Sequence, residues 1–260
     1  MTRVAVFDSG VGGLTVLRAI HQRLPGISTS YLGDTARVPY GTRSAETVVR
    51  YAENAARFLV EREKPELFVV ACNTASAVAL PALEATLEVP VVGVIDPTAD
   101  FAVKATRTGR IGVIGTQGTI RSEAYQRAIA ARSKDLFVVA RPCPLFVPLA
   151  EEGWTHDEIS AAIAERYLAP IRAERVDVLV LGCTHYPLLA QTLREVMGPD
   201  VTLVDAGRAT ADRVAKILSP KAGDDAARAY YVTDLPGGFL RVAERFLEEP
   251  IETLTEVDLV

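Results

Sequence analysis

The stretch Leu179-Val-Leu-Gly-Cys-Thr-His-Tyr-Pro187 has an earlier counterpart in Leu67-Phe-Val-Val-Ala-Cys-Asn-Thr74. Each is a short aliphatic run that ends in a small residue and a cysteine, followed by polar residues that suit the start of a helix. A continuous apolar run bounded by turn-type residues is typical of a buried parallel strand. Cys72 and Cys183 are therefore predicted at the carboxyl ends of strands, where open α/β sheets bind ligands.

Further pairs of segments repeat along the chain at a spacing of roughly 110 residues, which favours an internal duplication over chance similarity. Phe7-Asp-Ser-Gly10 corresponds to Ile114-Gly-Thr-Gln117, Cys72 to Cys183, and Val92-Gly-Val-Ile-Asp96 to Val201-Thr-Leu-Val-Asp205. Strand-like runs alternate with helix-like segments throughout. The predicted fold is α/β, with two similar lobes related by a pseudo-two-fold duplication. Each lobe has a mainly parallel sheet flanked by helices, and the site lies in the cleft between them.

The duplication suggests how the chain divides into lobes. Residues 1–96 form the first lobe together with 206–260, a C-terminal segment that returns to it, and residues 97–205 form the second. The tail from Ala206 onward is predicted to be mostly helical, with a break at Pro236-Gly-Gly238.

Two helix starts are marked by capping residues. Ser44 is expected to cap the helix that follows it. Thr155-His-Asp-Glu158 resembles a capping box, opening a helix with Ile159, Ala162 and Ile163 on one apolar face.

The composition narrows the class of protein. The chain has 260 residues, 49% hydrophobic and 23% charged, as in soluble globular proteins. The net charge of −5, without a basic cluster, argues against nucleic-acid binding. No apolar run is long enough to span a bilayer and no basic-then-apolar leader opens the chain, so we expect a cytoplasmic protein without a membrane partner.

The three cysteines are expected to be free thiols, because a reducing compartment disfavours disulfides. A helix N-terminus lowers a thiol pKa, so Cys72 and Cys183 are candidates for two facing bases. The alternative is that both are small buried apolar residues. Zinc is disfavoured because a single residue separates Cys183 from His185 and Cys72 has no neighbouring histidine. Cys143, between two prolines, is expected to be structural.

Histidines and carboxylates supply further candidates. His185 follows Cys183 by two positions and could tune the thiol or move a proton, although a structural role is the alternative. His21 and His156 are expected to be solvated. Asp8 ends the first strand, where it could be a helix cap or part of the site. The remaining candidate carboxylates, in loops that join the matched elements, are Asp34 and Glu151.

A pyridoxal cofactor would need a Schiff-base lysine. The lysines are Lys64, Lys104, Lys134, Lys216 and Lys221. None follows a predicted strand in a small-residue motif, so no cofactor is predicted.

Several segments together resemble the glutamate racemase family, and the similarity spans nearly the whole chain. They are Phe7-Asp-Ser-Gly-Val-Gly-Gly-Leu-Thr15, Gly33-Asp-Thr-Ala-Arg-Val-Pro-Tyr-Gly41, Ala71-Cys-Asn-Thr-Ala-Ser76, Cys143-Pro-Leu-Phe-Val-Pro-Leu-Ala-Glu-Glu-Gly153 and Gly182-Cys-Thr-His-Tyr-Pro187. Each motif alone is weak, but their combination is specific.

The resemblance implies an isomerase that interconverts L- and D-glutamate without a cofactor or metal and supplies D-glutamate for peptidoglycan. One thiolate removes the α-proton and the opposite thiol returns a proton to the other face. The resemblance makes Cys72 and Cys183 the two acid/bases, assisted by Asp8 and His185 respectively, and it suggests a homodimer. Alternatives are an aspartate or hydantoin racemase, or an amino-acid-binding protein without activity.

Other site residues follow from the resemblance. Asp34 has a supporting role, and Glu151, rather than Glu152, orients His185, whose presence also favours glutamate over aspartate. Substrate binding is assigned to Asp8, Ser9, Tyr40, Gly41, Asn73, Thr74, Thr116, Thr119, Thr184 and His185. Neutral donors and backbone N–H groups at helix starts can hold carboxylates without an arginine. The lobes are expected to close on the substrate, because proton abstraction from an unactivated carbon needs a water-poor site.

Overall fold

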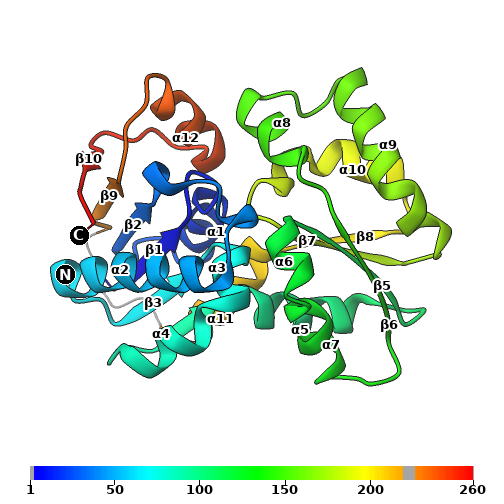
Figure 1. Cartoon of the computed structure of the whole chain (residues 1–260), viewed down its shortest axis with the longest axis horizontal. Coiled ribbons are helices and arrows are strands. Elements are labelled where there is room, and N and C mark those ends of the chain that lie inside the picture. Colours follow the sequence, from blue (N-terminus) through cyan, green and yellow to red (C-terminus); the bar gives the residue numbers. More distant parts are fainter. Residues whose placement is uncertain (1–2, 219–225, 260) are drawn as a thin grey trace.

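The computed structural model, which describes residues 3–218 and 226–259, contains two parallel sheets that lie beside each other (Figure 1). The larger sheet has the spatial order β10 (Thr255–Glu256), β9 (Arg228–Val232), β2 (Thr29–Gly33), β1 (Val4–Asp8), β3 (Leu67–Val70) and β4 (Val91–Gly93). The smaller sheet has the order β6 (Phe137–Pro142), β5 (Arg110–Gly115), β7 (Val178–Gly182) and β8 (Thr202–Asp205). The fold is thus the α/β architecture predicted from the sequence.

The two sheets repeat one strand order, which supports the duplication. In the larger sheet β2, β1, β3 and β4 are neighbours in that order, and β6, β5, β7 and β8 follow the same order in the smaller one. All strand pairs are parallel. The third strand of each unit, β3 or β7, leads to Cys72 or Cys183, so the repeat puts these two cysteines in equivalent places.

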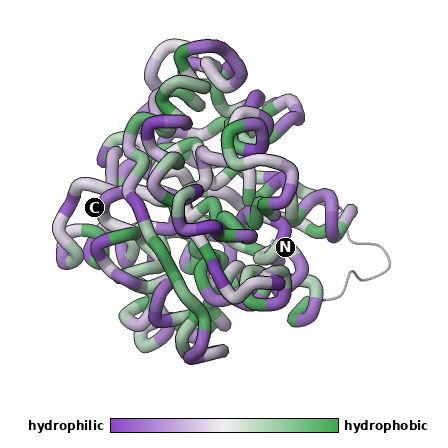
Figure 2. The backbone as a smooth tube through the Cα atoms, turned by 90° about the vertical axis from the view of Figure 1, so that its right-hand side faces the viewer, coloured by the Kyte–Doolittle hydropathy of each residue, from purple (hydrophilic) through white to green (hydrophobic). Residues whose placement is uncertain are grey.

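Helices connect the strands and cover the sheets (Figure 1). They are α1 (Leu14–Arg23), α2 (Ala45–Glu63), α3 (Asn73–Val78), α4 (Leu80–Thr86), α5 (Ile95–Ala105), α6 (Gln117–Arg121), α7 (Ala124–Ala130), α8 (Phe146–Glu152), α9 (Glu158–Ala173), α10 (Ala190–Met197), α11 (Ala206–Ile217) and α12 (Phe239–Leu247). Short 3-10 helices are η1 (Thr35–Arg37), η2 (Tyr40–Thr42) and η3 (Tyr186–Leu189). The tube in Figure 2 changes repeatedly between hydrophobic and hydrophilic stretches, as expected for buried strands that alternate with amphipathic helices.

One hydrophobic core joins the two halves of the molecule, which are the larger sheet and the smaller sheet, each with its covering helices. Residues of β1, α1 and α12 belong to the same buried cluster as residues of β5, β7 and α5. A second cluster lies between the larger sheet and α2. Because burying one aliphatic side chain stabilises the fold by about 1.5–3 kcal/mol, the shared cluster resists separation of the halves. The lobe limits 1–96 with 206–260, and 97–205, stay a prediction, and Lys221 lies outside the described residues.

The C-terminal tail is less helical than predicted. Arg228-Ala-Tyr-Tyr-Val232 is a strand, β9, that pairs with β2, and β10 pairs with β9. Aromatic and β-branched residues favour strands, and the open edge of β2 accepts a parallel neighbour. The C-terminal segment therefore extends the larger sheet.

The start of α9 also differs from the prediction. Ser44 caps α2 as expected, but the capping box of α9 is formed by Asp157 and Ser160. Ile159 is exposed, and the buried face carries Ser160, Ala164, Leu168 and Ile171. Of the three residues predicted to form the apolar face, Ile163 packs against the core, whereas Ile159 and Ala162 are exposed. Among the described residues, no helix has the length and apolar character that a membrane span requires.

Candidate active site

Cys72 and Cys183 line one cavity of about 270 Å³ between the two halves. The residues that line it are Ser9, Gly10, Val11, Val38, Pro39, Tyr40, Gly41, Cys72, Asn73, Thr74, Thr116, Val147, Glu151, Cys183, Thr184 and His185. They come from the carboxyl ends of β1, β3, β5 and β7, from the loop after β2 and from α8. A larger hollow of about 570 Å³ between α1, α10 and α11 contains no thiol. The chemistry available to the cavity is therefore set by two thiols and their neighbours.

The Cys72 thiol is buried at the N-terminal end of α3. Its sulfur accepts a hydrogen bond from the Ala75 backbone N–H at 3.4 Å and donates one to Ser9 Oγ at 3.4 Å. Burial, and secondarily the nearby Asp8 carboxylate, raises the pKa of Cys72 to about 12, although the two hydrogen bonds oppose the shift. At neutral pH Cys72 is therefore a thiol, ready to donate a proton.

Asp8 lies behind Cys72 and is not among the residues that line the cavity. Its Oδ2 accepts a hydrogen bond from the Gly10 N–H at 2.9 Å, while Oδ1 is buried without a hydrogen bond among the described residues. Burial raises the pKa of Asp8, and the charge of His185 and the surrounding backbone N–H groups oppose this. A β-carbon at Gly13 would lie 2.4 Å from that of Asp8, so only glycine lets the turn close over the carboxyl group. Asp8 therefore acts on the cavity through residues that line it, namely Cys72, His185 and Gly10.

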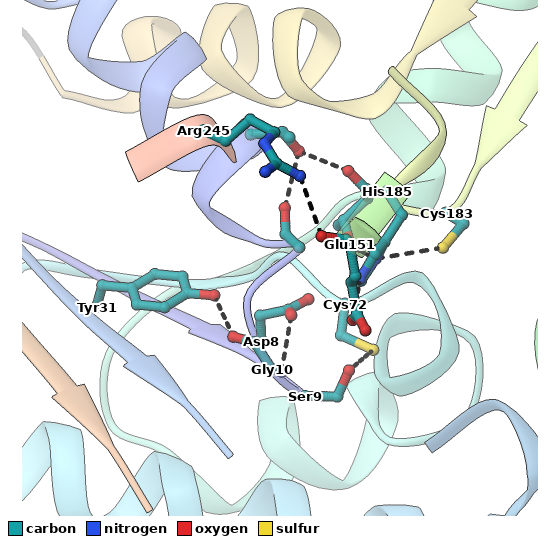
Figure 3. A network of polar contacts seen from close by, with 12 residues as sticks. Asp8, Ser9, Gly10, Tyr31, Cys72, Glu151, Cys183, His185 and Arg245 are labelled. Carbon is teal, nitrogen blue, oxygen red and sulfur yellow. Dashed lines mark hydrogen bonds and ion pairs between the residues drawn. The ribbon is translucent and has the colours of Figure 1, made fainter. Parts of the chain in front are cut away.

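Cys183 belongs to a chain of polar contacts that continues through His185 to Glu151 (Figure 3). The sulfur lies 3.9 Å from His185 Nδ1, and His185 Nε2 lies 2.9 Å from Glu151 Oε1. Burial opposes the imidazolium form, but the contacts with the Cys183 sulfur and the Glu151 carboxylate outweigh it and raise the pKa of His185 to about 10. Cys183 therefore faces a cation, whereas Cys72 faces a carboxyl group.

The turn after β1 packs directly against this second thiol. A β-carbon at Gly12 would lie 2.2 Å from Thr184 Oγ1 and 2.5 Å from His185 Nδ1. Thr15 Oγ1, one turn into the same segment, donates to the Thr184 carbonyl at 3.0 Å. The glycine-rich turn thus brings the first half of the chain into van der Waals contact with the Cys183 side of the cavity.

Asp34 lies outside the cavity wall and binds a residue that forms it. Tyr40 donates a hydrogen bond to Asp34 Oδ2 at 2.5 Å, and Thr233 donates to Oδ1 at 2.8 Å. The Arg37 guanidinium is 3.7 Å from the same carboxylate and donates to the Leu259 carbonyl at 2.7 Å. The C-terminal segment therefore fixes the loop that carries Tyr40.

Neutral polar groups form the rest of the polar wall of the cavity, and its apolar wall is formed by Val11, Val38, Pro39 and Val147. Asn73 Oδ1 accepts a hydrogen bond from Tyr125 at 2.6 Å, which leaves its buried Nδ2 without a partner among the described residues. Thr74 is hydrogen-bonded to Thr116 at 2.9 Å and to Thr119 at 3.3 Å. Thr119 supports the wall without lining it. Unpaired buried donors are costly, so the Asn73 amide suits a bound acceptor such as a carboxylate.

The remaining candidates lie away from the cavity. Cys143 is fully buried in the core, and His156 is exposed beside Glu195. His21 is buried, contrary to the prediction, because its Nε2 contacts Thr29 at 2.9 Å inside the fold. The described residues include no group of three or more His, Cys, Asp or Glu side chains that could hold a metal.

Sequence reasoning missed the contacts that α12 makes with this site. Arg245 Nη1 donates to the Glu151 carbonyl at 3.0 Å, and the Phe246 ring meets the His185 imidazole edge-on at 5.1 Å. Thr233, which binds Asp34, was missed too. The strong amphipathic pattern of α12 signalled a packed helix, but nothing in the sequence signalled its partner.

Comparisons with known proteins agree with this geometry. The sequence model described as "Asp/Glu/Hydantoin racemase" matches residues 12–214. A glutamate racemase of Geobacter metallireducens is 53% identical over 98% of this chain and 96% of its own. The crystal structure of the RacE1 isoform of glutamate racemase from Bacillus anthracis has a TM-score of 0.92 and 38% identity, covering 99% of this chain and 98% of that one. The Francisella tularensis glutamate racemase in complex with D-glutamate has a TM-score of 0.92 and 33% identity, covering 99% and 97%.

Proposed function

The chain belongs to the Asp/Glu/Hydantoin racemase family, and we propose that it interconverts L- and D-glutamate by a two-thiol mechanism. Glutamate racemization follows from the close relatives, which carry that name at up to 53% identity over nearly full length. The mechanism is supported by one observation above all, that two thiols from equivalent strand ends line the same small cavity.

The proton transfers balance without a cofactor. One sulfur, as thiolate, takes the α-hydrogen of the substrate as a proton, which leaves a carbanion that flattens at the α-carbon. The other sulfur, as thiol, gives its proton to the opposite face. Each turnover therefore exchanges the protonation states of Cys72 and Cys183. General acid–base transfer of this kind needs both groups within hydrogen-bond reach of the carbon.

The different surroundings of the two thiols give them different roles at the start of the reaction. His185, whose pKa is raised to about 10, stabilises negative charge on the Cys183 sulfur, and Glu151 holds the imidazole. Cys72, whose pKa is about 12, is the proton donor of the resting enzyme, with Asp8 as its neighbour. Asp34 acts through Tyr40.

Substrate carboxylates are assigned to the neutral donors of the cavity. Asn73, Thr74 and Thr184 lie beside the thiols and suit the α-carboxylate, and Ser9, Tyr40, Gly41 and Thr116 complete the wall. Thr119 contributes by holding Thr74. Fixed donors in a water-poor cavity are worth more than the same donors in water, which is how an unactivated α-proton becomes removable.

Exchange of the α-hydrogen with solvent tests the proposal. In D2O, each glutamate enantiomer should acquire deuterium at the α-carbon as it racemizes, read by NMR and circular dichroism. Cys72→Ser and Cys183→Ser should each lower racemization strongly and impair the two directions unequally. Cys143→Ser is the matched control, because that thiol is buried outside the cavity. Equal and negligible losses in all three variants would remove the two-thiol mechanism.

The same assay separates the alternatives. Turnover of aspartate or hydantoin in preference to glutamate would identify another specificity within the family. Binding of glutamate without deuterium uptake would identify a non-catalytic protein.

The wider role is proposed from the resemblance. It comprises supply of D-glutamate for peptidoglycan, a cytoplasmic location and a homodimer. Light scattering on the purified protein tests the dimer, and D-glutamate auxotrophy on deletion of the gene tests the supply.

A further inference from the structure

The C-terminal helix α12 belongs to one half of the molecule and contacts the acid–base pair of the other. It follows β9 of the larger sheet and packs on α1, whereas Glu151 and His185 follow strands of the smaller sheet. Arg245 donates a hydrogen bond to the Glu151 carbonyl at 3.0 Å. The fully buried Phe246 ring meets the His185 ring at 5.1 Å and 76°. Figure 3 shows Arg245 beside Glu151 and His185, on the side of the pair away from Cys72.

The Arg245 guanidinium lies at the C-terminal end of α8, where a positive charge stabilises a helix. The carbonyl end of a helix carries partial negative charge, and basic side chains there are stabilising. The last turn of α8 has no basic residue of its own, so Arg245 supplies the charge from another element. Gly153, at φ +82°, ends the helix, and a β-carbon there would lie 2.6 Å from Arg245 Nη1. The glycine therefore serves both the left-handed backbone and the approach of the arginine.

These contacts bear on the alignment of His185. The Cys183–His185 contact is long, at 3.9 Å, so it fixes the imidazole weakly. The ring is held instead by Glu151 at Nε2 and by Phe246 at its side. Glu151 is half exposed, and its helix end is held by Arg245.

We propose that Arg245 and Phe246 are positioning residues that align the Glu151–His185 pair with Cys183 across the boundary between the two halves. This inference rests on the two-thiol function proposed above. It implies that proton transfer at Cys183 depends on α12 being seated against α8. Separation of the halves would misalign the pair before it exposed the thiols.

If Arg245 is replaced, a role through charge alone and a role in positioning predict opposite changes in the pKa of His185. Removing a nearby cation by itself would raise the pKa of His185, because one repulsive charge is lost. Loss of the aligned Glu151 carboxylate would lower that pKa. The alkaline limb of the kcat–pH profile therefore distinguishes the two roles.

The experiment compares Arg245→Met with Arg241→Met in the full-length protein. Arg241 lies one turn earlier on the same helix, and in the part of the chain that the structure describes no hydrogen bond is assigned to its side chain. Arg245→Met should lower kcat about tenfold with KM within about twofold, and move the alkaline limb to lower pH. Arg245→Lys should recover most of the loss. Arg241→Met should stay within about twofold of the wild type.

The proposal is overturned if folded Arg245→Met behaves like Arg241→Met, or if its alkaline limb moves to higher pH. Where the methionine variant does not fold, Phe246→Leu carries the test, because it keeps an apolar group but removes the ring beside His185. A Phe246→Leu profile that coincides with the wild type overturns the proposal as well. Failure of the two-thiol function is separate, since it would appear in wild-type deuterium exchange and in the Cys72 and Cys183 variants.

Discussion

Replacing Glu151 by glutamine removes the charge that faces His185 while almost preserving the shape of the side chain. The hydrogen bond to His185 Nε2 is 2.9 Å long, and its acceptor is a carboxylate with 45% of its side chain exposed. A charge-assisted hydrogen bond contributes about 1.5–3 kcal/mol, and partial exposure screens the charge. We therefore use about 1.4 kcal/mol, which equals one pKa unit or a tenfold change. The pKa of His185 should fall from about 10 to about 9.

Two measurements check this value. The alkaline limb of the kcat–pH profile should move down by about one pH unit. Stability should change as well, because a histidine pKa raised by folding stabilises the native state fully below its ordinary value and loses that effect as pH rises through the folded value. Glu151→Gln should therefore unfold with about 1.4 kcal/mol less free energy at pH 6–7, or roughly 3–6 °C lower Tm. The difference should shrink towards pH 10.

Glu152→Gln is the matched control, because Glu152 is the adjacent acid on α8 and has no described contact with His185. The two variants carry the same change in net charge one residue apart. If they move the pH profile equally, or if Glu151→Gln moves it upward, the carboxylate does not hold the imidazolium and the reasoning fails.

Three further substitutions test other parts of the site. Asp8→Asn should abolish most activity yet raise the Tm at pH 7. Burial raises the pKa of Asp8, so keeping the buried carboxylate ionised costs about 1.4 kcal/mol of folding free energy for each pKa unit. Thermal melts should show the gain in Tm vanishing below about pH 4, and an unchanged Tm at pH 7 would contradict this prediction. Gly12→Ala should lower the unfolding free energy by about 1–3 kcal/mol through overpacking and reduce kcat, whereas Gly237→Ala, with nothing within 4 Å of the added carbon, should do neither in denaturant titrations and steady-state assays. Thr233→Val removes a donor from buried Asp34 and should raise KM for glutamate about threefold to tenfold through loss of about 1 kcal/mol of support for the Tyr40 loop, while an unchanged KM would show that the loop needs no such support.

The central part of this fold could be predicted from the sequence because its signals are local. An aliphatic run followed by a small residue and a cysteine places a thiol at a strand end whatever the rest of the chain does. The internal duplication then related Cys72 in the first unit to Cys183 in the second, although the two residues lie far apart in the sequence. The matching order of β2-β1-β3-β4 and β6-β5-β7-β8 gives Cys72 and Cys183 equivalent places in the two sheets, and both line one cavity.

The contacts of the C-terminal segment could not be predicted, because each depends on a partner far away in the chain. β9 pairs with β2, although the two strands lie near opposite ends of the sequence. This pairing places Thr233 beside Asp34 and α12 beside Glu151. His21 was misjudged for the same reason. Its helix shows charged neighbours, but the side chain is directed to Thr29 at the start of β2 and lies beside Glu249 of the tail. Helical periodicity reports which side of a helix is apolar, not what later covers it.

The opposite surroundings of the two thiols agree with what a racemase requires of them. Charges on the two sulfurs repel each other, and a Cys183 thiolate is one of the influences that raise the pKa of Cys72. The two-thiol mechanism keeps one proton on the pair of sulfurs throughout a turnover. A cation at His185 and a carboxyl group at Asp8 both bias that proton towards Cys72. A turnover that begins with Cys183 as base ends with the proton on Cys183 and negative charge beside Asp8, which is the less favoured state. The Ser9 hydroxyl and the Ala75 N–H beside the Cys72 sulfur reduce this cost, because their hydrogen bonds lower the pKa of Cys72, and they therefore help the reaction to run in both directions.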